Sequence, residues 1–122
     1  MYTDGSAIGN PGPGGYGIIL DWEGYIKELT GGYRKTTNNR MELMAVIIGL
    51  ESIKSKPALV TIYSDSKYIV DAIDKKWLFN WEKKDFKGKK NNDLWKRFLK
   101  IFRKHKVIFK WVKGHNNHPQ ND

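Results

Sequence analysis

The sequence contains no cysteine among its 122 residues. This absence excludes disulfide-stapled folds and metal sites built on thiolates, and it fits a protein of a reducing compartment. No apolar run reaches membrane-spanning length, and no signal-peptide pattern opens the chain. We therefore expect a cytoplasmic protein that is not associated with a membrane.

Acidic residues are scarce relative to basic ones, because 13 Asp and Glu stand against 22 Lys and Arg, for a formal net charge of +9. A surplus of this size favours a polyanionic partner, usually a nucleic acid. Aromatic residues are plentiful, with five Trp, six Tyr and five Phe. This composition excludes a disordered chain, and the length predicts a single domain spanning residues 1–122.

The hydrophobic pattern predicts the element order β-β-β-α-β-α-α-β, and hence a mixed sheet with helices packed on it, an α/β or α+β fold. A connector rich in Gly and Pro is expected between Asp4 and Tyr16. Strands are predicted over 1–4, 16–22, 25–30, 59–63 and 107–112, and the third of these continues over 33–35. Helices are predicted over about 40–55, 66–73 and 93–104, and Asp93 caps the last one.

Three carboxylates fall at the ends of these elements. Asp4 ends the first strand, Glu42 lies in the first turn of a buried helix, and Asp65 follows the strand over 59–63. Ligand sites in open α/β sheets form beyond strand ends, so the three can converge if the first and fourth strands are neighbours. Converging carboxylates need a hard cation, and oxygen ligands favour Mg²⁺ or Mn²⁺. Each residue alone has another interpretation, as an Asp-Gly turn, an acid favoured by the helix dipole, and a helix cap, respectively.

Four stretches of the sequence resemble ribonuclease HI of the type 1 ribonuclease H family. They are Thr3 to Ser6 with Gly9 to Gly17, Thr37 to Leu43, Ser64 to Tyr68, and Trp111 to His115, and the resemblance covers essentially the whole chain in register. It implies a ribonuclease H-like fold with a five-stranded mixed sheet flanked by helices. It also implies Mg²⁺-dependent endonucleolytic cleavage of the RNA strand in RNA/DNA hybrids, with 5′-phosphate products.

The resemblance also implies roles for individual residues. Asp4, Glu42 and Asp65 match metal ligands, assisted by the Gly5 carbonyl, for two Mg²⁺ ions that Mn²⁺ can replace. His115 matches a loop histidine that assists proton transfer or product release; without the resemblance it reads as a solvated loop residue.

The family's fourth metal-binding carboxylate opens a C-terminal helix, and both lie beyond the last residue here. Asp122 matches an acidic position shortly before that ligand, and we expect it to be the available substitute. The first strand is also shorter than in the family.

The segment from Lys75 to Lys90, hereafter the basic segment, carries seven lysines and two acids, with a net charge of +5. A charge run is usually a solvated face, but interleaved aromatic residues favour a handle that presents cations to phosphates. The segment matches the basic protrusion by which bacterial ribonucleases HI grip the DNA strand. The expected substrate contacts are Trp77, Trp81, Lys83, Lys84, Lys87 and Lys89, with Asn10, Asn38 and Asn39 on the RNA side and Thr37 and Asn80 around a DNA phosphate.

The leading hypothesis is a monomeric ribonuclease specific for RNA/DNA hybrids, without an obligate protein partner. The alternative is a nucleic-acid-binding module with the same fold and an impaired metal site. A transposase or a Holliday-junction nuclease of the same superfold is a more remote possibility, because a fold does not fix a substrate. Cleavage of a labelled hybrid in Mg²⁺ separates the first two hypotheses.

Overall fold

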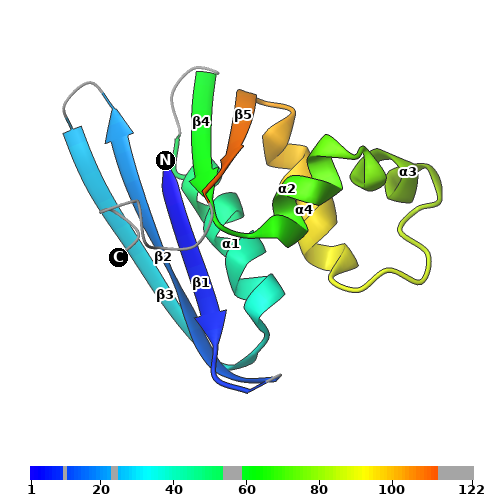
Figure 1. Ribbon diagram of the computed structural model, residues 1–122, viewed down its shortest axis with the longest axis horizontal. Coiled ribbons are helices and arrows are strands. Elements are labelled where there is room, and N and C mark those ends of the chain that lie inside the picture. Colours follow the sequence, from blue (N-terminus) through cyan, green and yellow to red (C-terminus); the bar gives the residue numbers. More distant parts are fainter. Residues whose placement is uncertain (10, 23–24, 54–58, 113–122) are drawn as a thin grey trace.

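The computed structural model describes residues 1–9, 11–22, 25–53 and 59–112. Within these residues one five-stranded mixed sheet has the strand order β3-β2-β1-β4-β5, so the predicted sheet with flanking helices is confirmed (Figure 1). No helix among the described residues is both long enough and apolar enough to cross a membrane. The strands are β1 (Tyr2–Ala7), β2 (Gly12–Trp22), β3 (Tyr25–Thr36), β4 (Leu59–Ser64) and β5 (Lys106–Trp111), and the helices are α1 (Asn38–Glu51), α2 (Lys67–Asp74), α3 (Trp77–Lys83) and α4 (Asn92–Phe102).

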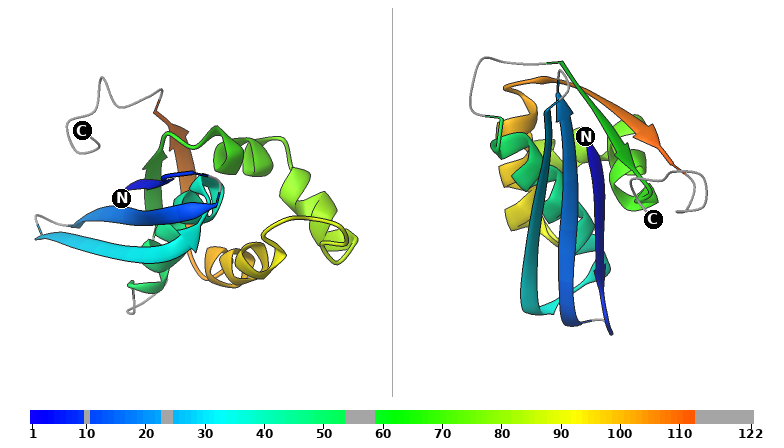
Figure 2. Two further views of the ribbon diagram at one scale, coloured as in Figure 1. Left: turned by 90° about the horizontal axis from the view of Figure 1, so that it is seen from below. Right: turned by 90° about the vertical axis from the view of Figure 1, so that its left-hand side faces the viewer.

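The strand direction changes at β1, which is antiparallel to β2 and parallel to β4. Its pairing with β4 is short, because only Tyr2 and Thr3 have partners there, Tyr63 and Ser64. Beyond Thr3, β1 continues to Ala7 paired with β2 alone. From Asp4 onward, the edge of β1 that faces β4 therefore has no strand partner. All four helices of the described chain lie on the same side of the sheet (Figure 2).

Helix α1 is the centre of the core, packed between the sheet and α4. Nine of its 14 residues are buried, as the apolar side chains on nearly every face of the predicted helix require. Thr37 is its N-cap, with an extended backbone and an Oγ1 that accepts a hydrogen bond from the Arg40 amide at 3.2 Å. This hydrogen bond satisfies one of the amides in the first turn that have no partner within the helix. On α4, Trp95 and Phe98 are fully buried.

The first hairpin is longer than predicted. Strand β1 does not end at Asp4 but runs to Ala7, and β2 begins at Gly12 and not at Tyr16. The sequence predicts a connector at these glycines, whereas in the structure they permit close strand pairing. Gly14 lies opposite Ala7, and a Cβ on Gly14 would be only 2.5 Å from the Ser6 carbonyl oxygen. Strand β3 likewise continues without a break across the interruption predicted between 30 and 33.

The helix boundaries also differ from the prediction. Helix α1 begins at Asn38 rather than Arg40, which places Glu42 in the second turn, and it ends at Glu51, several residues before the predicted end. The N-cap of α4 is Asn91, and Asp93 instead pairs with Arg40. Helix α3 was not predicted, because its seven residues follow Lys76, a cap position without a side-chain hydrogen bond.

Candidate active site

Asp4 and Asp65 become neighbours because of the short pairing between β1 and β4. Thr3 and Ser64 are the last paired residues, so Asp4 and Asp65 are the next residue along each chain. After Asp65 the chain turns into α2, where Ser66 is the N-cap and its Oγ accepts from the Ile69 amide at 3.4 Å. The Trp111 Nε1 donates to the Asp65 carbonyl oxygen at 3.4 Å. These contacts hold the Asp65 backbone beside the open edge of β1.

Glu42 reaches the same place from α1, which lies unusually close to β1. A Cβ on Gly5 would be 2.5 Å from the Met41 carbonyl carbon and 2.7 Å from the Glu42 nitrogen. Only glycine permits this approach without a shift of the helix. The Gly5 amide also donates to Glu42 Oε1 at 3.3 Å. Gly5 therefore positions Glu42 through its amide and its missing side chain, and metal ligation by its carbonyl stays a prediction.

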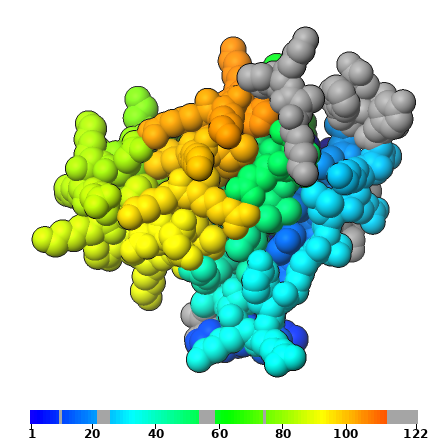
Figure 3. Space-filling model, turned by 180° about the vertical axis from the view of Figure 1, so that it is seen from behind, coloured from blue at the N-terminus to red at the C-terminus, as the bar shows by residue number. Residues whose placement is uncertain are grey.

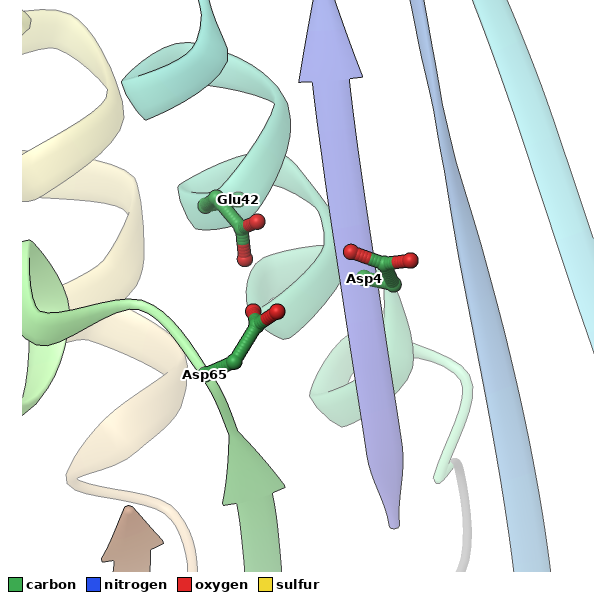
Figure 4. Close-up of side chains that lie close together, drawn as sticks. All are labelled: Asp4, Glu42 and Asp65. Atoms are coloured by element: carbon green, nitrogen blue, oxygen red, sulfur yellow. The ribbon is translucent and has the colours of Figure 1, made fainter. Parts of the chain in front are cut away.

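The three carboxylates converge, as Figure 4 shows for Asp4 on β1, Glu42 on α1 and Asp65 just after β4. One carboxylate oxygen from each lies within 4.8 Å of the others. The alternative interpretations are wrong in their geometry, since Asp4 lies inside a strand, Glu42 lies in the second helical turn, and Ser66 rather than Asp65 caps α2. An oxygen-only ligand set of this size suits a hard divalent cation.

The electrostatics of Glu42 also suit a cation. Its side chain is almost wholly buried, with 9% relative exposure, and its Oε2 has no hydrogen-bond partner among the described residues. Burial raises the pKa of Glu42 to about 8, with further contributions from the charges of Asp65 and Asp4 and a small opposing effect of the Gly5 amide. A bound cation would favour the ionised carboxylate and supply the missing partner.

A pocket of about 340 Å³ surrounds the carboxylates. Of the predicted substrate contacts, Asn38 and Asn39 line it, and Asn38 Oδ1 accepts a hydrogen bond from the Ala7 amide. Thr37 lies just before them as the cap of α1. Four further lining residues were not assigned a role from the sequence, although three belong to the Ser64 to Tyr68 stretch: Ser6, Ser66, Lys67 and Tyr68.

The basic segment forms a separate surface, and none of its residues lines the carboxylate pocket. Trp77 is 44% exposed beside Lys75, whose Nζ lies 4.9 Å from the ring centroid. Trp81 is half-buried and packs edge-on against Trp95 at 5.8 Å, with the Lys89 Nζ 5.3 Å from its ring. The other predicted contacts of this segment are exposed: Asn80, Lys83, Lys84 and Lys87. Asn10, His115 and Asp122 lie outside the described residues.

Comparison with known proteins identifies the family. The sequence model described as RNase H matches residues 1–122. The chain belongs to the ribonuclease H family. The family resemblance of the four sequence stretches is thereby confirmed.

Curated members of the family are similar over the whole chain. The Ribonuclease H of Lachnoclostridium phytofermentans is 56% identical over 100% of this chain and 84% of its own length. The Ribonuclease H of Desulforamulus reducens is 51% identical over 100% of this chain and 79% of its own length.

Solved structures of the family share the fold. LC9-RNase H1, a type 1 RNase H with the type 2 active-site motif, superposes with a TM-score of 0.80 at 31% identity. That match covers 98% of this chain, which spans 64% of the solved chain. LC11-RNase H1, solved in complex with an RNA/DNA hybrid, superposes with a TM-score of 0.74 at 26% identity, over 96% of this chain and 86% of its own.

The raised pKa of Glu42 makes the stability of the metal-free protein depend on pH. Its stabilising contribution is complete below the unfolded-state pKa near 4.5 and is lost as the pH rises through the folded-state pKa of about 8. We expect Glu42→Gln to be more stable than the unsubstituted protein at pH 8.5 by roughly 3 kcal/mol, and this advantage to shrink toward pH 5. Urea unfolding in EDTA at both pH values measures the difference. An advantage that does not change with pH would contradict the assignment.

The close approach at Gly5 predicts a costly substitution. In Gly5→Ala the new methyl group must displace the backbone of α1 at Met41 and Glu42, so we expect a loss of roughly 1–3 kcal/mol in the free energy of unfolding. Gly17→Ala is the matched control, because Gly17 pairs with Asp4 and its added Cβ would have no atom within 4 Å. Chemical denaturation measures both variants. Equal stabilities of the two variants would show that α1 yields freely at this position.

Proposed function

We propose that this chain is an endoribonuclease that hydrolyses the RNA strand of RNA/DNA hybrids. The observation that carries the proposal is the convergence of Asp4, Glu42 and Asp65 within 4.8 Å, in a chain of the ribonuclease H family. A relative of the same fold, LC11-RNase H1, was solved with an RNA/DNA hybrid. We further propose that the protein acts as a monomer in the cytoplasm.

The carboxylates fit a divalent metal centre, with Mg²⁺ as the proposed ion and Mn²⁺ as a substitute. They offer only oxygen ligands, and the buried Glu42 Oε2 has no partner among the described residues. Asp4, Glu42 and Asp65 would hold the metal. Two ions, when bound, supply charge neutralisation and the activation of water for in-line attack on a phosphodiester. The attack breaks the bond to the 3′ oxygen and leaves a 5′-phosphate and a 3′-hydroxyl.

The chain's own groups provide orientation and access. Asp4 and Asp65 are held by neighbouring strands and Glu42 by a buried helix, so the ligand geometry is preorganised and little is lost in ordering it. Asn38 and Asn39 border the pocket and offer amide groups at its rim. We propose that they contact the RNA strand, where amide groups can bond to 2′-hydroxyls, the groups that distinguish RNA from DNA. His115 and Asp122 keep the roles proposed from the resemblance.

The basic segment supplies the second contact with the hybrid. Its exposed lysines, supported by Trp77 and Trp81, suit the phosphates of a DNA strand, and the net charge of +9 favours the approach of any nucleic acid. In this arrangement the acidic pocket acts on one strand while the basic segment holds the other. Binding and cleavage therefore depend on different residues.

The proposal predicts cleavage of RNA only when it is paired with DNA. In Mg²⁺ we expect a labelled hybrid to be cut, while single-stranded RNA and duplex DNA of the same sequence stay intact. Asp4→Asn should lower the initial rate by at least about a hundredfold, because it removes a charged ligand from the cluster, while binding of the hybrid remains. Gel-resolved initial rates measure both effects. Hybrid binding without any cleavage by the unsubstituted chain would instead support the binding-module alternative.

The proposed grip predicts how salt affects binding. Replacing Lys83, Lys84, Lys87 and Lys89 with Ala should weaken hybrid binding and reduce the slope of log K against log salt by roughly 0.9 for each phosphate that a lysine no longer neutralises. The rate at saturating substrate should change far less, because these lysines do not line the carboxylate pocket. The control is Lys27→Ala/Lys35→Ala, because both lysines are exposed and lie on β3 at the far edge of the sheet. An unchanged slope in a fluorescence titration would mean that the basic segment is only a solvated surface.

A further inference from the structure

The backbone adopts strained conformations within the basic segment and at the residue that follows it. The described residues include four non-glycine positions with positive φ, and all lie between 76 and 91: Lys76 at 59°, Asp85 at 53°, Phe86 at 57° and Asn91 at 59°. For residues other than glycine, a backbone conformation in this left-handed region is unfavourable in free energy. Such a conformation persists only where tertiary contacts over-determine it. The contacts that hold the segment therefore decide where its lysines lie.

Apolar contacts hold the inner side of the segment. Leu78 is fully buried and Phe86 is 4% exposed. Trp81 packs edge-on against the buried Trp95 of α4. These contacts hold the inner side of the segment against the core and leave the position of its outer side to polar contacts.

A directional contact joins the outer side of the segment to α4. Glu82 on α3 and Arg103 at the C-cap of α4 form a bidentate ion pair, with the two guanidinium nitrogens 2.6 and 2.7 Å from the two carboxylate oxygens. Hydrogen bonding to Arg103 lowers the pKa of Glu82, so the pair stays ionised at neutral pH. Seen from behind, the segment (yellow-green) lies beside α4 (yellow to orange) (Figure 3). A bidentate fork fixes orientation as well as distance.

We propose that the Glu82–Arg103 pair is a positioning device that sets the angle of the basic segment and so its spacing from the three carboxylates. The proposal rests on the proposed function, since it concerns how the same hybrid is gripped and cut. A duplex that contacts both the carboxylate pocket and the basic segment binds most tightly when the distance between these two surfaces matches the distance between its own contact points. Disrupting the pair should therefore weaken hybrid binding, although neither residue lines the carboxylate pocket.

Charge alone makes the opposite prediction for one of the two residues. Glu82 is an acid inside a surface that attracts phosphates, so its neutralisation should tighten the binding of a polyanion. If the pair acts by position, Glu82→Gln and Arg103→Gln both weaken binding. The sign of the effect of Glu82→Gln thus separates the two explanations.

The chain offers a matched control on the same helix. Arg97 of α4 forms a bidentate pair with Glu51 of α1, at 2.5 and 2.7 Å, away from the basic segment. The side-chain exposures are comparable, 43% and 32% for Arg97 and Glu51 against 54% and 37% for Arg103 and Glu82. Exposed ion pairs contribute little to stability, so both disruptions should change the melting temperature similarly. Only loss of the Glu82–Arg103 pair should change hybrid binding.

The experiment compares Glu82→Gln, Arg103→Gln, the double variant, the exchange Glu82→Arg/Arg103→Glu, and Glu51→Gln with Arg97→Gln. KM and kcat for a hybrid are measured in Mg²⁺, and equilibrium binding of the same hybrid is measured in EDTA. We expect each single substitution at the 82–103 pair to raise KM and Kd by roughly fivefold with kcat nearly unchanged. The double variant should bind the hybrid no more weakly than either single variant, and the exchange should recover most of the affinity. Two residues in contact commonly have a coupling free energy large enough for a fivefold effect on Kd.

Two outcomes would overturn the proposal. The first is a Glu82→Gln variant that binds the hybrid as tightly as, or more tightly than, the unsubstituted chain. The second is an equal drop in affinity in Glu51→Gln or Arg97→Gln, which would make the effect one of general stability. If the unsubstituted chain binds but does not cleave, the proposed function fails, while the binding measurements in EDTA still decide the role of the pair.

Discussion

The contact between α1 and β1 at Gly5 is the constraint on which the site depends. Because Gly5 has no side chain, the helix backbone approaches the strand closely enough for the Gly5 amide to reach Glu42 Oε1. The short pairing of β1 with β4 leaves β1 without a strand partner on that side beyond Thr3, so Asp4 and Asp65 face the same space. One backbone approach and one short strand pairing are thus sufficient to bring together carboxylates that are far apart in the sequence.

This arrangement is unfavourable by itself and is stabilised by the core around it. Holding Glu42 buried beside two aspartates raises its pKa to about 8, which represents roughly several kcal/mol against its ionised form. The same helix buries six large apolar side chains, and each one fully removed from water contributes about 1.5–3 kcal/mol. Hydrophobic burial of α1 is therefore large enough to hold the carboxylates together before any cation neutralises them.

The sequence predicts the site better than it predicts the elements that carry it. The strand over 59–63, the buried helix and the three acids were recognisable because a β-branched run, an all-round apolar pattern and the motifs around Asp4, Glu42 and Asp65 are local signals. The extent of β1 and β2 is not recognisable from the sequence, because Gly14 and Gly15 are typical of a connector. Only the opposite strand in the structure shows that they permit close pairing. The sequence predicts Asp93 as a cap, because its pairing with Arg40, 53 residues away, leaves no local trace. The Glu82–Arg103 pair leaves no local trace for the same reason, whereas helix α3 is not predicted because no capping side chain marks its start.

Helix α4 connects the two charged surfaces while keeping them apart. At its N-terminal end, Asp93 pairs with Arg40 two residues before Glu42, and the Trp95 Nε1 donates at 2.9 Å to the hydroxyl of Tyr68, which lines the carboxylate pocket. On another side, Trp95 supports Trp81 of the basic segment. The acidic cluster and the lysines of the basic segment are consequently both anchored to the same rigid element, and none of the segment's residues lines the carboxylate pocket. If the lysines paired directly with the carboxylates, they would compete both with a cation for the acids and with phosphates for the bases. Separation by a packed helix preserves the charge of both surfaces, so each remains available to its own ligand.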